Sequence, residues 1–490
     1  MDKVGLSGKY QTYPEYKRIS SKWVAEIPTH WQSIFFKRIV IGIKDGTHGT
    51  HVRVNEGLPF LSAKNVMYSG INISDSESMI SKKDHQEITG NGFPKKGDLL
   101  ITCVGTIGRT CVYEFDEPHA FQRSVAFLRL SRLAESKFYK YFVESKPYQS
   151  QLEAQSKASA QSGVYMGDLI NTLTVLPPKN EQQKIANFLD YETAKIDTLI
   201  EKQQQLIKLL KEKRQAVISH AVTKGLNPNA PMRDSGVEWL GQVPEHWDVA
   251  RFKHLVHEGV AGPYGSSLTK SMYLLKGIRV YGQQQVIPDD FSVGDYYISE
   301  KKFEEMRRYE VFPNDILISV MGTVGKVAVA PENIERGIIN PRLVKYKVME
   351  DKVHPYFIKL SIGSDVSQSR LLFSSQGSTM DGLNMQILGE LPIPYPPSLN
   401  DQTEILNEVS RQDDKFENLL RKTQVTVELL SERRTALISA AVTGKIDVRD
   451  WVAPESSNNT MDSRLRGNDA ELNAAVDVNT EADLSKEAGL

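Results

Sequence analysis

The chain has 490 residues, of which 60 are Lys or Arg and 61 are Asp or Glu, so its formal net charge is −1. Hydrophobic residues make up 40% and charged residues 25%. These globular values exclude a mostly disordered, collagen-like or purely coiled-coil chain, and the length predicts two or three domains, each able to bury a core.

Charge is distributed unevenly along the chain. Residues 1–226 carry a net charge of +8, whereas residues 450–490 carry −6 and have few aromatic side chains. We therefore expect residues 448–490 to form a disordered acidic tail.

The two cysteines, Cys103 and Cys111, are too few for a disulfide framework. The N-terminus lacks an apolar signal-peptide core, and no apolar run is long enough to span a membrane. These features predict a cytoplasmic protein that does not contact a membrane.

A repeat of domain size organises the chain. The motif WVAEIPTHW at Trp23 returns as WLGQVPEHW at Trp239. The segment GDLLITCVGTIGR at Gly97 returns as NDILISVMGTVGK at Asn314, and two later matches keep the same order and nearly the same offset. This period is the length of a whole domain and far longer than a solenoid repeat. The chain is therefore predicted to be a tandem duplication of one module.

Each copy is predicted to contain short buried strands followed by a helix. In the first copy, apolar runs predict strands at Asp98–Val104 and Val125–Leu130 and a helix at Glu135–Ser156. The second copy repeats this order at Asp315–Met321, Leu343–Val348 and Pro355–Ser375. Two copies of an α/β (α+β) globular domain follow from this pattern.

A long helix is predicted to close each copy. About 42 residues at a rise of ~1.5 Å give roughly 60 Å of helix. Apolar residues at heptad positions predict that the two helices pack on each other. These positions are Ile196, Leu199, Leu206, Leu210 and Val217 in the first helix and Phe416, Leu419, Leu430 and Leu437 in the second. The alternative is that each helix packs only on its own domain.

These features divide the chain into six parts. The globular domains comprise residues 1–177 and 239–396, and the long helices comprise residues 178–226 and 397–447. A linker, residues 227–238, joins the halves, and the acidic tail follows at residues 448–490.

Searches for catalytic and cofactor motifs find none. The turns GTIGRT and GTVGKV lack the spacing and residues of a P-loop, and no HExxH or cysteine-rich metal motif occurs. Tyr395-Pro396-Pro397 does not have the residue order expected of an amino-methyltransferase loop. We therefore predict that the chain itself holds no catalytic residue, metal or cofactor.

Two alternatives remain open at this point. Asp289, Glu300 and Lys302 resemble a nuclease site in which two carboxylates hold Mg²⁺ and a lysine steadies water. The aligned stretch of the first copy, Ser81–Asp84, lacks a carboxylate at the matching position, so a solvated charged surface explains these residues better. The other alternative is a scaffold that binds proteins and no DNA.

Several polar and basic residues suit double-stranded DNA. The glycine turns end in Arg109 and Lys326, and backbone N–H groups beside a cation suit a phosphate. The amides of Asn65 and of Gln283, Gln284 and Gln285 can pair with adenine in the major groove. Further candidates are Lys64, which aligns with Gln284, the polar-loop residues Thr47 and His48, and the cations Lys37, Arg38, Arg123 and Arg342. The alternative for each is an ordinary turn, polar loop or solvated charge.

The duplicated motifs resemble a known family. The WxxxIPxHW opening at Trp23, the GTIG and GTVG turns, and the entry PPxxEQxxI at Pro177 resemble the DNA specificity subunit of type I restriction–modification systems. The second entry departs slightly, with Asp401-Gln402 in place of Glu-Gln. The resemblance covers residues 10–447 and leaves out the acidic tail.

The resemblance implies a non-catalytic subunit. Each globular half would be a target recognition domain that reads one part of a bipartite, asymmetric DNA sequence. The long helices would form an antiparallel coiled-coil spacer that docks two methyltransferase (modification) subunits. Restriction subunits with translocase activity would join them. S-adenosylmethionine, ATP and Mg²⁺ are expected on these partners, and half-sites roughly 34–36 Å apart would match such a dimer-like geometry.

Overall fold

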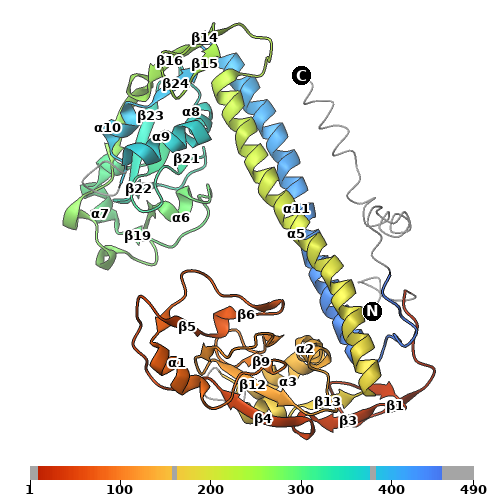
Figure 1. Ribbon diagram of the computed structural model, residues 1–490. Coiled ribbons are helices and arrows are strands. Elements are labelled where there is room, and N and C mark those ends of the chain that lie inside the picture. The colour runs from red at the N-terminus through yellow and green to blue at the C-terminus, as the bar shows by residue number, and fades with distance from the viewer. Residues whose placement is uncertain (1–8, 157–162, 376–381, 455–490) are drawn as a thin grey trace. The chain divides into compact units, whose positions relative to one another are not determined.

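The computed structural model describes residues 9–156, 163–375 and 382–454. These residues fall into two compact units (Figure 1). The first unit contains residues 9–205 and 424–454, and the second contains residues 206–423. Each unit therefore holds one copy of the repeated module together with part of each long helix. Most of the predicted acidic tail lies outside the described residues.

The first unit is built on two small sheets. An antiparallel sheet has the order β10 (Thr110–Val112), β9 (Leu99–Thr102), β12 (Val125–Leu130) and β4 (Val40–Asp45). A second sheet has the order β11 (Ala120–Phe121), β5 (Leu58–Leu61) and β8 (Met79–Ile80), and β11 pairs with β5 in parallel. Every residue of β9 is buried, because this central strand is covered on both faces.

The second unit repeats this topology strand for strand. Its antiparallel sheet has the order β17 (Val256–Ala261), β23 (Leu343–Val348), β20 (Ile316–Ser319) and β21 (Val327–Val329). Its smaller sheet has the order β19 (Tyr297–Ile298), β18 (Ile278–Tyr281) and β22 (Gly337–Ile339), with β18 and β22 parallel. The predicted α/β (α+β) class in two copies is confirmed, and the largely antiparallel pairing makes α+β the more accurate term.

Shorter elements complete each unit. The remaining strands are β1 (Tyr16–Arg18), β2 (Glu26–Pro28), β3 (Gln32–Phe35), β6 (Val66–Met67), β7 (Gly70–Ile71), β13 (Leu173–Leu176), β14 (Met232–Asp234), β15 (Gln242–Pro244), β16 (Asp248–Arg251) and β24 (Pro392–Tyr395). The short helices are α1 (Lys82–Thr89), α4 (Met166–Ile170), α6 (Gln283–Val286), α7 (Glu300–Glu305) and α10 (Met385–Gly389).

The single helix predicted after the strands is wrong in both copies, because each is broken in the middle. The pairs are α2 (Ser136–Glu144) with α3 (Lys146–Ser156), and α8 (Pro355–Gly363) with α9 (Asp365–Ser375). At each break a serine of a long helix accepts a hydrogen bond from the first N–H of the new helix. Lys146 N donates to Ser439 Oγ (3.1 Å), and Asp365 N donates to Ser219 Oγ (2.9 Å). A tertiary contact therefore supports the start of each second helix.

The long helices α5 (Lys179–Lys224) and α11 (Leu399–Val442) run antiparallel to each other within each unit. In the first unit, Lys184 donates a hydrogen bond to Arg449 O, and Arg434 Nε donates to Asp197 Oδ1 (2.8 Å). In the second unit, Arg214 forms a bidentate pair with Asp413 and a further contact with Glu417. Arg214 and Arg434 are equivalent residues of the two helices, so the duplication extends to the charges between them.

The row of α5 side chains that faces α11, here called the seam, is shifted by one residue from the predicted row at two positions. Of the predicted positions on α5, Ile196 and Leu210 are buried and Val217 is half-buried. On α11, Phe416, Leu430 and Leu437 are buried and Leu419 is half-buried. Leu199 and Leu206 are exposed, so the prediction that they face the other helix is wrong. The seam instead follows Ile196, Ile200, Gln203, Ile207 and Leu210, with the alternating spacing of four and three residues that keeps one face inward.

Candidate nucleic-acid interface

The loops at one end of each four-stranded sheet are joined by hydrogen bonds. In the first unit, the chain leaving β4 meets the turn between β11 and β12. Thr47 N donates to Phe121 O (2.8 Å), and Arg123 N donates to Thr47 O (3.1 Å). We call this surface the loop edge, which comprises residues 46–48, 63–65, 105–109 and 122–124 in the first unit and residues 262–264, 283–285, 322–326 and 340–342 in the second.

A glycine makes this close approach possible in both units. A Cβ on Gly46 would lie 2.2 Å from Gln122 O, and a Cβ on Gly262 would lie 2.0 Å from Asn340 O. Gly46 N donates to Val125 O (3.0 Å) and Gly262 N donates to Leu343 O (2.9 Å). Because no side chain fits between these backbones, the direction in which the following loop leaves the sheet is fixed.

The glycine turns are held by a glutamine that the sequence analysis did not identify. Gln149 Nε2 donates to Gly108 O (2.9 Å), and Gln368 Nε2 donates to Gly325 O (2.8 Å). Both glycines have positive φ, +80° and +79°, a conformation that favours glycine. The two glutamines occupy matching positions of the repeat, and each precedes a serine. This repeated Gln-Ser pair is the sequence signal that marks the glutamine as part of the shared scaffold.

The predicted cations of the glycine turns have different surroundings. Arg109 Nη1 donates to Val66 O (3.1 Å), which fixes the half-buried guanidinium beside β6. Lys326, its counterpart, is exposed, as are Arg123 and Arg342. Arg342 Nη1 donates to Gln283 Oε1 (3.2 Å). The second loop edge therefore presents an oriented arginine and an exposed lysine.

Gln283 connects three parts of the second loop edge. Its Nε2 donates to Ser319 Oγ (2.7 Å) and Met321 O (2.6 Å), while its Oε1 accepts from Arg342. The neighbouring Gln284 is exposed. Gln283 thus braces the glycine turn and orients a cation, and Gln284 presents its amide to solvent.

The predicted base contacts of Asn65 and Gln285 do not fit the structure. Both side chains are 2% exposed, and their amides are engaged inside the loops. Asn65 accepts from Ser62 N and donates to Asn72 O and Glu77 Oε1, whereas Gln285 accepts from Gly282 N and donates to Val293 O. Each caps the start of a short helix, so neither amide is available to a base edge.

Lys64, Thr47 and His48 lie at the surface of the first loop edge. Lys64 pairs with Glu77 (2.8 Å), and this hydrogen bond is the main reason why the pKa of the Glu77 carboxyl lies below its usual range. His48 Nε2 lies 2.6 Å from Asp45 Oδ2, and Thr47 Oγ1 lies 3.2 Å from His51 Nε2. These contacts hold the polar loop that follows β4.

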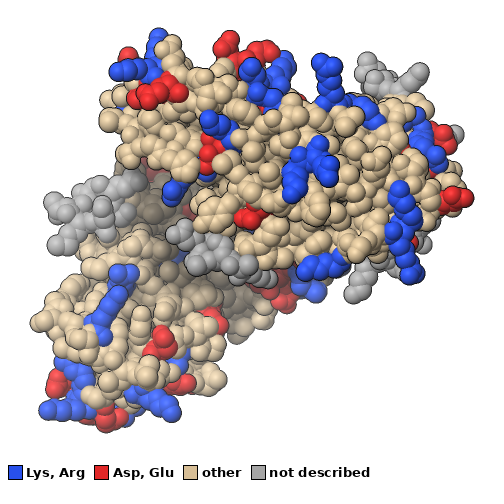
Figure 2. Space-filling model, turned by 90° about the horizontal axis from the view of Figure 1, so that it is seen from below, with Lys and Arg blue, Asp and Glu red and all other residues tan. Residues whose placement is uncertain are grey.

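Lys37 and Arg38 are not brought to the loop edge. They precede β4, whereas Thr47 and His48 follow it, and six strand residues span about 20 Å. Lys37 Nζ donates instead to Asn171 Oδ1 (3.1 Å). The face shown in Figure 2 has Lys and Arg side chains dispersed among Asp and Glu over a largely uncharged surface. On that face, cations are scattered and form no continuous basic stripe.

Comparison with known proteins identifies the duplicated architecture. A family model described as the type I restriction modification DNA specificity domain matches residues 50–209 and again residues 277–428. The chain belongs to the type I restriction modification DNA specificity family. Each match lies within one copy of the repeat, and together they confirm the resemblance found in the sequence.

Individual members of this family are similar to the chain over most of its length. The EcoBI specificity subunit of Escherichia coli is 24% identical over 369 residues, covering 73% of this chain and 75% of the relative. The MjaVIII specificity subunit of Methanocaldococcus jannaschii is 21% identical over 315 residues, covering 63% and 70%. A solved structure from a study of complex assembly and conformational transition of the type I R-M system has a TM-score of 0.63 at 16% identity, covering 86% of this chain and 99% of that one. The HsdS subunit of Thermoanaerobacter tengcongensis gives 0.46 at 17% identity, covering 86% and 98%.

As a member of a DNA specificity family, the chain is a recognition subunit and not a catalytic one. The residues of the nuclease alternative agree with this assignment because each has a different partner. Asp289 pairs with Lys359, Glu300 with Arg336 (2.8 Å), and Lys302 with Glu305 (2.9 Å). Among the described residues no cluster of His, Cys, Asp or Glu could hold a metal ion, and no helix is long and apolar enough to cross a membrane.

Proposed function

We propose that each loop edge contacts one half of a bipartite, asymmetric DNA sequence. The observation that carries this proposal is the repetition of one loop scaffold with different side chains. Gly46 and Gly262, and the turns at Gly108 and Gly325, keep the same backbone approach. The side chains placed on this scaffold differ, with Arg109 where the second unit has Lys326. Equal scaffolds with unequal side chains suit two half-sites of unequal sequence.

Removing a loop-edge cation should weaken DNA binding for all sequences alike. Arg342→Ala and Arg109→Ala each remove a candidate phosphate contact, so we expect lower affinity and a salt slope reduced by about one. The measurement is the salt dependence of DNA binding by the assembled complex. Lys253→Ala is the matched control, because Lys253 pairs with Glu390 and precedes β17 at the opposite end of that strand. Equal losses for the control and the loop-edge variants would contradict the assignment.

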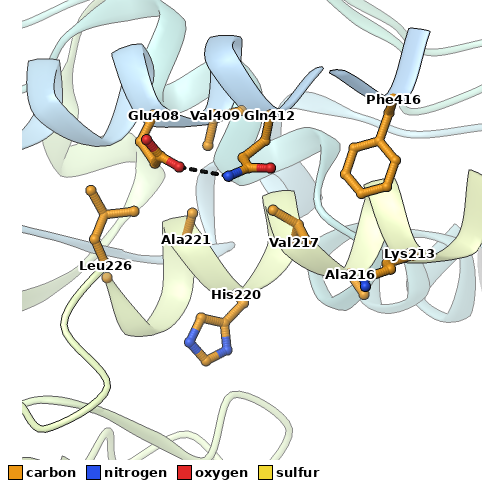
Figure 3. Close-up of a pocket in the computed structure, with 11 residues that line it drawn as sticks. Lys213, Ala216, Val217, His220, Ala221, Leu226, Glu408, Val409, Gln412 and Phe416 are labelled. Atoms are coloured by element: carbon orange, nitrogen blue, oxygen red, sulfur yellow. Dashed lines mark hydrogen bonds between the residues drawn. The ribbon is translucent and has the colours of Figure 1, made fainter. Parts of the chain in front are cut away.

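We also propose that the helix pair acts as a spacer and docks two modification subunits, with restriction subunits joining them. S-adenosylmethionine, ATP and Mg²⁺ would belong to those partners. A cavity of about 700 Å³ in the second unit supports docking (Figure 3). There, Val217 and Ala221 of α5 face Val409 and Phe416 of α11. The cavity is mainly apolar and opens to the surface, so it suits an apolar side chain of a partner.

The equivalent place in the first unit is filled by the chain itself. Tyr10 and Trp451 both pack on Phe188, with ring centroids 5.4 and 5.5 Å away, and Tyr10 Oη donates to Glu192 Oε2 (2.9 Å). By the repeat, Tyr10 corresponds to Leu226, a smaller residue at the cavity wall. The comparison supports an aromatic side chain of a modification subunit as the occupant in the second unit.

Filling the cavity should separate stability from docking. We expect Leu226→Tyr to stabilise the second unit by about 0.5–2 kcal/mol, because the ring fills empty apolar space, and to weaken association with the modification subunit at least tenfold. Thermal unfolding and titration with the purified modification subunit measure the two effects. Leu209→Tyr is the control, since Leu209 is exposed on α5. Unchanged affinity of the Leu226 variant would place docking elsewhere.

A further inference from the structure

An exposed aromatic residue stands at the second loop edge with no role in the fold described above. Tyr264 is 68% exposed and follows Gly262-Pro263 at the end of β17. In the register that aligns Trp23 with Trp239, Tyr264 corresponds to His48. The His48 side chain is 64% exposed. Both units therefore place an exposed ring two residues after the glycine that the close approach requires.

The surrounding hydrogen bonds fix the backbone from which each ring projects. Gly262 N is bonded to Leu343 O (2.9 Å), so the loop leaves the sheet beside the turn that carries Arg342. Tyr264 O accepts from Ser267 N (3.4 Å), which closes the loop into a short helical turn, Gly265–Ser267. In the first unit the imidazole of His48 is held by Asp45 at 2.6 Å. The scaffold therefore sets the backbone position of both residues, and Asp45 additionally orients the His48 ring.

We propose that Tyr264 and His48 are equivalent specificity-determining residues, each contacting base edges in the major groove of one half-site. This inference rests on the proposed function of the loop edges. A tyrosine offers a ring face to a thymine methyl group and a hydroxyl that donates or accepts a hydrogen bond. The imidazole of His48 is smaller and is oriented by a carboxylate. Different rings at one position read different bases, which is how two equal scaffolds acquire unequal targets.

The test is a competition assay on the assembled complex, using DNA targets with every base changed in turn in either half-site. We expect Tyr264→Ala to reduce discrimination tenfold to hundredfold at one or two positions of one half-site and to leave the other half-site unchanged. His48→Ala should act only on the other half-site. Tyr264→Phe separates the two contributions, since it keeps the ring and loses the hydroxyl.

Controls separate this inference from the proposed function. Phe312 is also an exposed aromatic residue, but it precedes β20 and so lies at the opposite end of that strand from the glycine turn; Phe312→Ala should leave all preferences unchanged. A uniform loss of affinity with Tyr264→Ala, or an effect on both half-sites, would overturn the inference. If Arg342→Ala weakens binding while Tyr264→Ala alters no preference, the inference fails and the proposed function stands. If neither variant has an effect, both fail.

Discussion

Replacing Leu430 with aspartate should lower the free energy of unfolding of the first unit by about 3–5 kcal/mol. Leu430 is 6% exposed and belongs to the hydrophobic core in which α5 and α11 meet the globular domain. The change removes a buried side chain and leaves a carboxylate in an apolar site. Its neighbour Leu429 is 42% exposed, so Leu429→Asp should change stability by less than about 0.5 kcal/mol.

Chemical unfolding of the full chain, followed by circular dichroism, measures this difference. The chain forms two compact units. We therefore expect the denaturant midpoint of the first unit to fall while that of the second unit stays near its original value. The two variants make the same substitution at adjacent positions of one helix. The side chain of Leu430 is buried and that of Leu429 is exposed. Equal destabilisation by the two variants would mean that the helix face is assigned wrongly.

The sequence predicts the duplicated architecture well because apolar patterning is repeated. The strands Val125–Leu130 and Leu343–Val348 occur at the predicted residues, since the apolar residues that begin each strand are buried, although the second strand also contains a buried Lys345 and an exposed Lys347. Local pattern does not reveal a helix start supplied by another part of the chain. Ser439 and Ser219 lie far along the sequence from the helices whose first N–H groups donate to them. Local signals are also present at both breaks, because Pro147 follows the first and Ser364 Oγ accepts a hydrogen bond from Ser367 N (3.4 Å) after the second.

The candidate site could be predicted as a region but not residue by residue. The glycine turns and the loop after β4 were found from their residue types, which reflect backbone geometry. Asn65 and Gln285 have the right chemistry for adenine, yet their amides cap loops internally, and composition cannot distinguish these uses. The helix seam was misassigned for a related reason. The adjacent apolar pairs Leu199-Ile200 and Leu206-Ile207 allow two registers that fit the sequence equally well.

The glycine at the start of the second loop edge should be the least replaceable residue of that surface. A Cβ on Gly262 would meet Asn340 O at 2.0 Å and Leu343 O at 2.9 Å. Both obstacles are backbone atoms, so no side-chain rotation relieves the clash, and β17 must separate from the turn that carries Arg342. Overpacking of this kind costs about 1–3 kcal/mol or more. Gly262→Ala should therefore abolish discrimination in one half-site, because every loop-edge residue of that unit is displaced together.

The matched control is Gly363→Ala, since a Cβ at Gly363 meets no atom within 4 Å and the residue lies at the end of α8. Binding of the assembled complex to targets altered in either half-site measures the effect, and unfolding of the full chain measures its cost. Gly46→Ala should give the mirror result, because its Cβ would lie 2.2 Å from Gln122 O in the first unit. If each variant loses discrimination in one half-site only, the two loop edges read DNA independently. If either glycine variant impaired both half-sites equally while the other unit stayed folded, recognition would depend on a surface other than the loop edges.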